Sequence, residues 1–497
     1  MLFNSFNFLL FFPFVTILYF AIPHRFRYFW LLIASYFFYM SWNPKYALLL
    51  ASSTIITYLS GILIDFSNKN SNENKRNFQR KLWVFLSFSS NLSILFFFKY
   101  FDFAISNINF VFAHIGIKLL NPSFDILLPI GISFYTFQAL SYTMDIYRGE
   151  IAAEKNIAKY ALFVSFFPQL VAGPIERSKN LLNQMTERHY FDYDRVKNGL
   201  LLMLWGYFEK LVIADRLALI VNEVFANTDK YTGFQIAVPM ILFAFQIYCD
   251  FAGYSNISRG AGQVMGFKLM ENFRQPYFAV SIQDFWRRWH ISLSAWFRDY
   301  LYIPLGGNRR SKARKYINVF ITFVISGLWH GAAWNFFIWG ALHGTYQIIG
   351  QITKPFKDKI CQTFKINQNT KLYQAGKIIM TFILVDFAWL FFRAQDGEFI
   401  TIIKKLFAKF NYAVLFHGRL VGKEFKDDLY LGIFFIVILM IINGFQNKNP
   451  NKPIREIIAR QNIFVRWTFY YGAIFIILIF GIYDQAYKAR DFIYFQF

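Results

Sequence analysis

The apolar run at residues 317–352 constrains the fold more than any other segment, because it contains no charged side chain apart from two histidines, His330 and His343. As one helix it would extend about 54 Å at 1.5 Å per residue, whereas the hydrocarbon core of a bilayer is about 30 Å thick. The run must therefore break and turn. Gly327 and Gly331 flank His330 and are the expected place, because glycine adopts dihedrals that other residues avoid. We expect a membrane hairpin or re-entrant pair over 317–352, with His330 near its break.

His330 has two interpretations at this stage. Ionisable groups at membrane depth are costly and often mark a functional site. A histidine packed between helices and bonded to a backbone carbonyl would give the same pattern. The run alone leaves catalysis and packing open.

The composition predicts an all-α polytopic membrane protein. Hydrophobic residues make up 56% of the chain and aromatic residues 22%, and apolar segments recur along its whole length. We expect roughly eleven transmembrane helices together with interfacial and re-entrant helices. No linker separates a soluble part, so residues 1–497 are expected to form a single integral-membrane domain.

The net charge of +23, from 52 basic and 29 acidic residues, is concentrated in loops. Basic clusters lie at 69–81, 309–315, 354–377 and 448–466, and short basic loops remain on the cytoplasmic side. This places both ends of the 317–352 run on one side of the cell's inner, cytoplasmic membrane. Anionic membrane lipids are therefore the expected partners of the basic clusters. Nucleic acid is not, because no soluble domain is present to bind it.

Residues 281–303 predict one amphipathic helix lying in the membrane interface, with an aromatic face and a charged face. Ser281 and Asp284 resemble a capping box at its start. His290 falls at the edge of the apolar face beside Ser294, which points its ring toward the protein interior. A plain interfacial anchor and a buried histidine bonded to Ser294 or a carbonyl are the alternatives. This histidine and His330 could converge on one cavity, a point that the sequence alone leaves open.

Other charges in apolar segments are interpreted as structural. Each of the adjacent pairs Glu209–Lys210 and Asp215–Arg216 is expected to neutralise itself or to snorkel to the membrane surface. Asp250 is expected either to orient one of the histidines or to bind Arg259. No metal site is expected, because two histidines without nearby cysteines or paired carboxylates do not form a zinc ligand set.

Eight motifs in order along the chain carry a resemblance to a known family. They lie at 8–27, 35–43, 128–138, 167–177, 250–255, 284–292, 298–308 and 328–334. Together they resemble the membrane-bound O-acyltransferases, in particular the bacterial branch that includes the alginate O-acetylation membrane protein. The two histidines fall in the sixth and eighth motifs.

The resemblance implies that His330 is the family's catalytic histidine and that His290 is a second active-site position. It implies transfer of acetyl groups from a cytoplasmic thioester donor across the membrane for O-acetylation of a cell-surface or exported polysaccharide. Acetyl-CoA or another acyl thioester would be the donor substrate, with no bound cofactor. A membrane-anchored or periplasmic esterase-like acetyltransferase is the implied partner.

The residues suit that chemistry, since a neutral imidazole is a good general base for a hydroxyl proton. We expect His330 to act as base or transient acyl carrier and His290 to orient substrate or stabilise charge. Trp329, Asn335, Ser294 and Asp250 are candidates to bind substrate. A D-alanyl transferase for teichoic acids, a lipid acyltransferase and a transporter or flippase are the alternatives.

Overall fold

Every regular element that the structure describes is a helix, which confirms the all-α prediction. The structure is a computed structural model and describes residues 1–120, 129–171, 173–408, 420–422, 425–483 and 493. Residues 128 and 172, each part of one of the eight motifs, lie outside these ranges.

Among the described residues, six helical segments are long and apolar enough to cross a membrane. They are Pro44–Ser67, Glu73–His114, Phe234–Met265, Lys371–Arg393, Lys426–Lys448 and Ile463–Phe480. The chain is therefore a multi-pass membrane protein. The total of roughly eleven spans stays a prediction.

The chain divides into two compact units. The first, called here the N-terminal unit, comprises residues 1–200 and 258–270, and the second, the C-terminal unit, comprises 201–257 and 271–497. The single integral-membrane domain stays a prediction. The N-terminal unit contains α1 (Phe6–Ala21), α2 (His24–Met40), α3 (Pro44–Ser67), α4 (Glu73–Leu95), the π-helix η1 (Phe96–Tyr100), α5 (Phe101–His114), α6 (Ile132–Tyr147), α7 (Ile157–Ser165), α8 (Phe167–Leu170), α9 (Ser178–Gln184) and the start of α10 (Tyr193–Tyr207).

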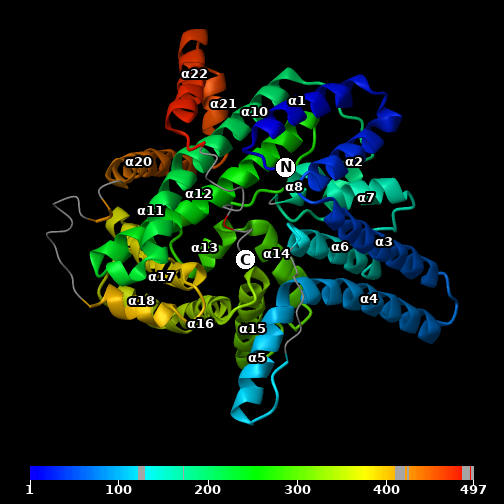
Figure 1. Cartoon of the computed structure of the whole chain (residues 1–497), viewed down its shortest axis with the longest axis horizontal. Helices are drawn as coiled ribbons and strands as arrows, with labels where there is room; N and C mark the ends of the chain where they lie inside the picture. Colours follow the sequence, from blue (N-terminus) through cyan, green and yellow to red (C-terminus); the bar gives the residue numbers. More distant parts are fainter. Residues whose placement is uncertain (121–128, 172, 409–419, 423–424, 484–492, 494–497) are drawn as a thin grey trace. The chain divides into compact units, whose positions relative to one another are not determined.

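Small hydroxyl and amide side chains hold α3, α4, α6 and α7 together. The Ser53 hydroxyl of α3 donates to the Asn91 amide oxygen of α4 at 2.5 Å, and the Tyr160 hydroxyl of α7 donates to Thr57 of α3 at 2.7 Å. Such bonds replace the hydrophobic effect as the attraction between helices in lipid. Figure 1 shows α3, α4 and α6 lying side by side.

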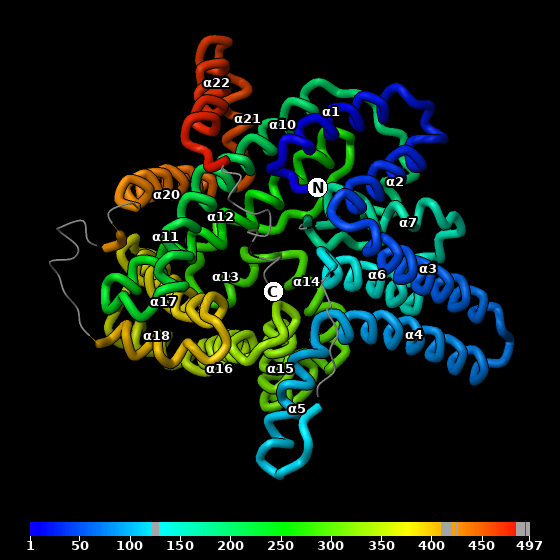
Figure 2. Tube along the Cα trace, in the orientation of Figure 1, coloured from blue at the N-terminus to red at the C-terminus, as the bar shows by residue number. Residues whose placement is uncertain are grey.

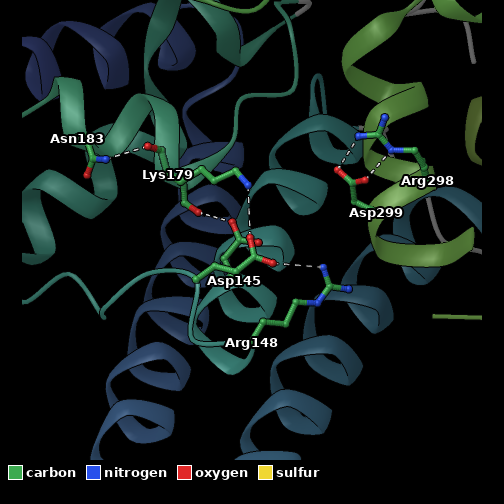
Figure 3. A network of polar contacts seen from close by, with 8 residues as sticks. Asp145, Arg148, Lys179, Asn183, Arg298 and Asp299 are labelled. Carbon is green, nitrogen blue, oxygen red and sulfur yellow. Dashed lines mark hydrogen bonds and ion pairs between the residues drawn. The ribbon is translucent and has the colours of Figure 1, made fainter. Parts of the chain in front are cut away.

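The end of α6 is tied to α9 by polar contacts (Figure 3). The Ser178 hydroxyl donates to Asp145 at 2.6 Å, and Lys179 lies 3.4 Å from the carboxylate of Glu150. The first bond is buried and fixes the start of α9. The second is exposed, and pairs of this kind contribute about 0–1 kcal/mol.

The C-terminal unit contains the two histidine segments. Its elements are the end of α10, the π-helix η2 (Phe208–Ala214), α11 (Asp215–Ala226), η3 (Thr228–Lys230), most of α12 (Phe234–Met265), η4 (Pro276–Phe278), α13 (Ile282–Arg288), α14 (Ile291–Phe297), the π-helix η5 (Arg298–Tyr302), α15 (Lys312–His330), α16 (Trp334–Thr363), α17 (Lys371–Arg393), α18 (Phe399–Leu406), α20 (Lys426–Lys448), α21 (Ile454–Ala459) and α22 (Ile463–Phe480). At the start of η5, Arg298 and Asp299 pair at 2.7 Å (Figure 3).

The 317–352 run breaks after His330, where α15 ends, and α16 begins at Trp334 (Figure 2). Glycines let the two helices approach closely. A Cβ at Gly327 would overlap the carbonyl oxygen of Phe336, and a Cβ at Gly340 would overlap that of Phe323. Positions near the end of α15 therefore face the start of α16, which is the pairing of an antiparallel hairpin.

We expect Gly340→Ala to lower the free energy of unfolding by about 1–3 kcal/mol, because its methyl group meets backbone that cannot move aside. Gly350→Ala is the matched control in the same helix, since no atom lies within 4 Å of a Cβ there. Alanine should stabilise that position by up to about 1 kcal/mol. Unfolding of both purified variants in detergent measures the difference, and equal stability would show that α15 and α16 are not closely packed.

Candidate active site

His330 is the last residue of α15 and is 4% exposed. Its ring lies edge-on to Trp339 and Phe392, at centroid distances of 5.1 and 5.3 Å. The next residue, Gly331, has φ −159°, which is extended backbone open to any residue. Its Cβ would overlap the ring of Phe336. Glycine is therefore required at the break for space, and not for the unusual dihedrals that the sequence suggested.

The prediction of one continuous helix over 281–303 is wrong. The Ser281 hydroxyl does accept the Asp284 N–H at 3.1 Å, but α13 ends at Arg288. His290 then adopts the left-handed conformation, with φ 42° and ψ 55°, and α14 starts after it. Such a conformation costs a non-glycine residue about 1–3 kcal/mol and persists only where surrounding contacts impose it. α13 and α14 have seven residues each, so neither can cross a bilayer.

The segment around Asn272 imposes the break at His290. The Arg274 N–H donates to the Arg288 carbonyl at 2.9 Å on one side of the break, and the Ile291 N–H donates to the Asn272 carbonyl at 3.0 Å on the other. The Asn272 side chain also accepts from the Ser292 hydroxyl at 2.7 Å. In a continuous helix the same backbone groups would form hydrogen bonds within the helix. The helical periodicity of the sequence contains no signal of this competing pairing.

Both candidate histidines lie against the indole of Trp329. The ring centroid of Trp329 is 6.2 Å from that of His290 and 4.9 Å from that of His330. His290 is fully buried and also lies perpendicular to Phe251 at 4.7 Å. The structure therefore brings together the two histidines that the sequence singled out, with the predicted Trp329 in contact with both.

Burial lowers the pKa of His290 to about 3. The charged imidazolium is the poorly solvated form in this apolar site, so burial favours the neutral ring. A neutral imidazole has one nitrogen that donates and one that accepts a hydrogen bond. His290 can therefore donate to a negatively charged oxygen without carrying charge itself.

His343, the other histidine of the 317–352 run, joins α13 to the hairpin. It is fully buried, and its Nδ1 accepts from the indole N–H of Trp286 at 3.2 Å. This bond places the proton of a neutral His343 on Nε2. Trp286 lies in α13, four residues before His290, and His343 lies in α16, the helix that follows His330. The bond therefore fixes α13 against α16.

The remaining predicted site residues contact other parts of the protein. The Asn335 amide donates to the Ala394 carbonyl at 2.8 Å and holds the start of α16 to the end of α17. The Ser294 hydroxyl donates to the Trp289 carbonyl at 3.4 Å. Asp250 accepts from Lys210 at 2.6 Å, so its expected pairing with a histidine or with Arg259 is wrong.

The expectation that adjacent opposite charges neutralise each other is also wrong. Lys210 lies between Asp215 at 2.7 Å and Asp250 at 2.6 Å, and all three side chains are at most 5% exposed. Arg216 pairs with Asp428 of α20. Adjacent residues on a helix point about 100° apart, so partners come from the next turn or from another helix. The π-helix η2 contributes to this because it aligns residues five apart, such as Lys210 and Asp215.

Comparisons with known proteins identify the family of the chain. The family model of the MBOAT, membrane-bound O-acyltransferase family matches residues 148–394, which include both histidines and Trp329. The chain belongs to this family. The "Probable alginate O-acetylase AlgI" of Pseudomonas putida is 34% identical over 510 residues, which cover 100% of both chains.

Two further relatives of this MBOAT protein carry other names. The "Peptidoglycan O-acetyltransferase" of Helicobacter pylori is 34% identical over 85% of this chain and 83% of its own length. The "Teichoic acid D-alanyltransferase" of Bacillus subtilis is 28% identical over 55% of this chain and 71% of its own. The chain is therefore a membrane O-acyltransferase. Its described residues include no group of three or more His, Cys, Asp or Glu side chains that could hold a metal ion.

We expect Lys210→Met to lower the free energy of unfolding of the MBOAT protein by about 3–5 kcal/mol, because it leaves Asp215 and Asp250 buried without their cation. Lys371→Met is the control, since Lys371 is exposed. Lys371→Met should change the free energy of unfolding by no more than about 0.5 kcal/mol. Unfolding in detergent measures both variants, and a stable Lys210→Met would contradict the structural role of the ion pairs.

Proposed function

We propose that the protein moves acetyl groups from a cytoplasmic thioester donor, acetyl-CoA or another acyl thioester, across the inner membrane for O-acetylation of a cell-surface or exported polysaccharide. One observation carries the proposal: two buried histidines, each at a helix break, lie against the same indole. Two of the relatives named above are O-acetylating enzymes of a polysaccharide or of peptidoglycan, which supports acetyl as the transferred group.

The reaction needs one proton acceptor and one hydrogen-bond donor. The hydroxyl oxygen of the acceptor attacks the thioester carbonyl carbon, the C–S bond breaks, and the hydroxyl proton finally resides on the leaving thiol. His330 takes that proton as general base, or first accepts the acetyl group on its ring and passes it to the hydroxyl. A positioned base contributes about 10²–10⁴-fold to the rate.

His290 stabilises the negative charge that develops on the carbonyl oxygen, or orients the substrate. Its ring is neutral and therefore retains an N–H donor, and a single donor of this kind contributes about 10²–10³-fold. In this scheme Trp329, whose indole contacts both imidazoles, forms a wall of the reaction site. Asn335, Ser294 and Asp250 are not needed in this scheme, since their side chains bond to protein groups.

The depth of His330 supports transfer across the membrane. α15 starts at Lys312 within the basic cluster 309–315, which the positive-inside rule places in the cytoplasm. Its 19 residues extend about 28 Å, comparable to the hydrocarbon thickness. His330 is at the end of α15 away from the basic cluster, and we infer that a donor from the cytoplasmic side and an acceptor from the other side meet there. An esterase-like partner outside the membrane would then place the acetyl group on the final glycan.

We expect His330→Ala to lower O-acetylation at least about 10²-fold and His290→Ala about 10²–10³-fold. The measurement is the O-acetyl content of cell-surface glycans in a deletion strain complemented with each variant at equal membrane abundance. His114→Ala is the matched control, because His114 is exposed.

Each outcome of this experiment decides between the candidate functions. Full complementation by His330→Ala would make His330 a packing residue and reject the mechanism. A change in D-alanyl esters in place of acetyl esters would identify the transferred group as D-alanine. If wild-type protein restores neither ester, the acyl-transfer proposal fails and transport becomes the better explanation.

A further inference from the structure

The N-terminal unit contains a cavity of about 290 Å³ that is lined only by its own residues. None of the histidines, tryptophans or buried charges discussed above belongs to it. Part of its lining is apolar and buried, with Leu31, Leu162 and Met185 at most 5% exposed. Its other side carries the basic residues Arg25 and Lys159. A small, amphiphilic and negatively charged molecule fits such a lining.

Two helices begin at this cavity. α2 starts at His24 after Pro23 and has no side chain capping its first N–H groups, and α7 starts after Asn156, with Lys159 in its first turn. Both His24 and Asn156 line the cavity. A helix N-terminus carries a partial positive charge and attracts anions. The uncapped start of α2 therefore adds to the charge of the basic side chains, whereas the Asn156 side chain already accepts from the Ala158 and Lys159 N–H groups at the start of α7.

Arg27 supplies a fixed positive charge at the cavity. Its guanidinium donates to three backbone carbonyls, of Ile22 at 3.0 Å, His189 at 2.5 Å and Phe20 at 3.2 Å. Carbonyl oxygens hold the group in place without cancelling its charge. Its position is thus determined before any ligand arrives.

One polar atom of a lining residue has no hydrogen-bond partner among the described residues. It is the Nδ1 of His24, which is buried. Arg25 and Lys159 rest on the rings of Phe26 and Tyr28, at 4.7 and 5.7 Å from the ring centres. Glu187 is the one carboxylate among the lining residues that the structure describes. Three cations against one carboxylate leave a net positive site.

The cavity lies on the predicted cytoplasmic side. Arg80 of the basic cluster 69–81 donates to the Tyr147 carbonyl at the end of α6. The Tyr58 hydroxyl of α3 donates at 2.6 Å to the carbonyl of Lys155, just before α7 begins. The start of α7 is therefore on the side of the unit where the basic cluster lies, which the positive-inside rule places in the cytoplasm.

We propose that this cavity binds a phosphate ester from the cytoplasmic side. Two sources carry that group there: the headgroup of an anionic phospholipid, and the nucleotide phosphates of a coenzyme A donor. The second source rests on the proposed function, whereas the phosphate site itself does not. Phosphate oxygens accept from Arg25 and Lys159 beside the fixed charge of Arg27, and the apolar residues take the glycerol or nucleoside portion.

The test compares two doubly substituted full-length proteins that lose the same charge. Arg25→Gln with Lys159→Gln removes two of the three cations that line the cavity. Lys155→Gln with Arg188→Gln removes two exposed cations that do not line it. Each protein is titrated with coenzyme A, and separately placed in phosphatidylcholine nanodiscs of rising phosphatidylglycerol content, with bound lipid counted by native mass spectrometry.

We expect the cavity variant to bind one of the two probes about tenfold more weakly than wild type, and the control to stay within about twofold. If the cavity variant binds only phosphatidylglycerol more weakly, the cavity is a lipid site. If it binds only coenzyme A more weakly, the cavity is a donor site. If both probes bind the two variants equally well, or if wild type binds neither, the proposal is wrong. Lys159→Gln alone replaces the double variant if that protein does not fold, since Lys159 is half-buried.

Discussion

The close approach of α15 and α16 is the constraint on which the rest of the candidate site depends. It requires Gly327 and Gly340 in the contact and Gly331 at the break, because a Cβ at each would overlap a neighbouring atom. The break ends α15 at His330, so the side chain at that position stands at a helix terminus among aromatic rings. The position of His330 therefore depends on three residues that have no side chain.

The second histidine is held by two independent attachments. The Trp286–His343 bond fixes α13 to α16 before His290. After His290, the Asn272 side chain accepts a hydrogen bond from Ser292. His290 is left in a strained, left-handed conformation between them. Strain of this kind is found at sites where position matters more than stability. Its ring is held against Trp329 in the protein without substrate, and the role proposed for His290 requires such a pre-positioned donor.

The sequence predicted the features that follow from length and motif, and missed those that follow from tertiary contacts. The break at His330 could be foreseen, because an apolar run of that length cannot cross a bilayer straight. The break at His290 could not, because the amphipathic pattern continues through it and the bonds from Asn272 leave no periodic signal. The partners of Lys210 were missed for a related reason: neighbours in sequence suggest a pair, whereas the buried carboxylates come from other turns.

The most direct test of the central claim, that His290 and His330 serve one reaction site, is the initial rate of O-acetylation by the double variant His290→Ala with His330→Ala. Groups that act on the same transition state give losses that do not add. We predict a double variant within about tenfold of the slower single variant. A rate reduced by the full product of the two single losses would show that the histidines act independently, and would contradict the account.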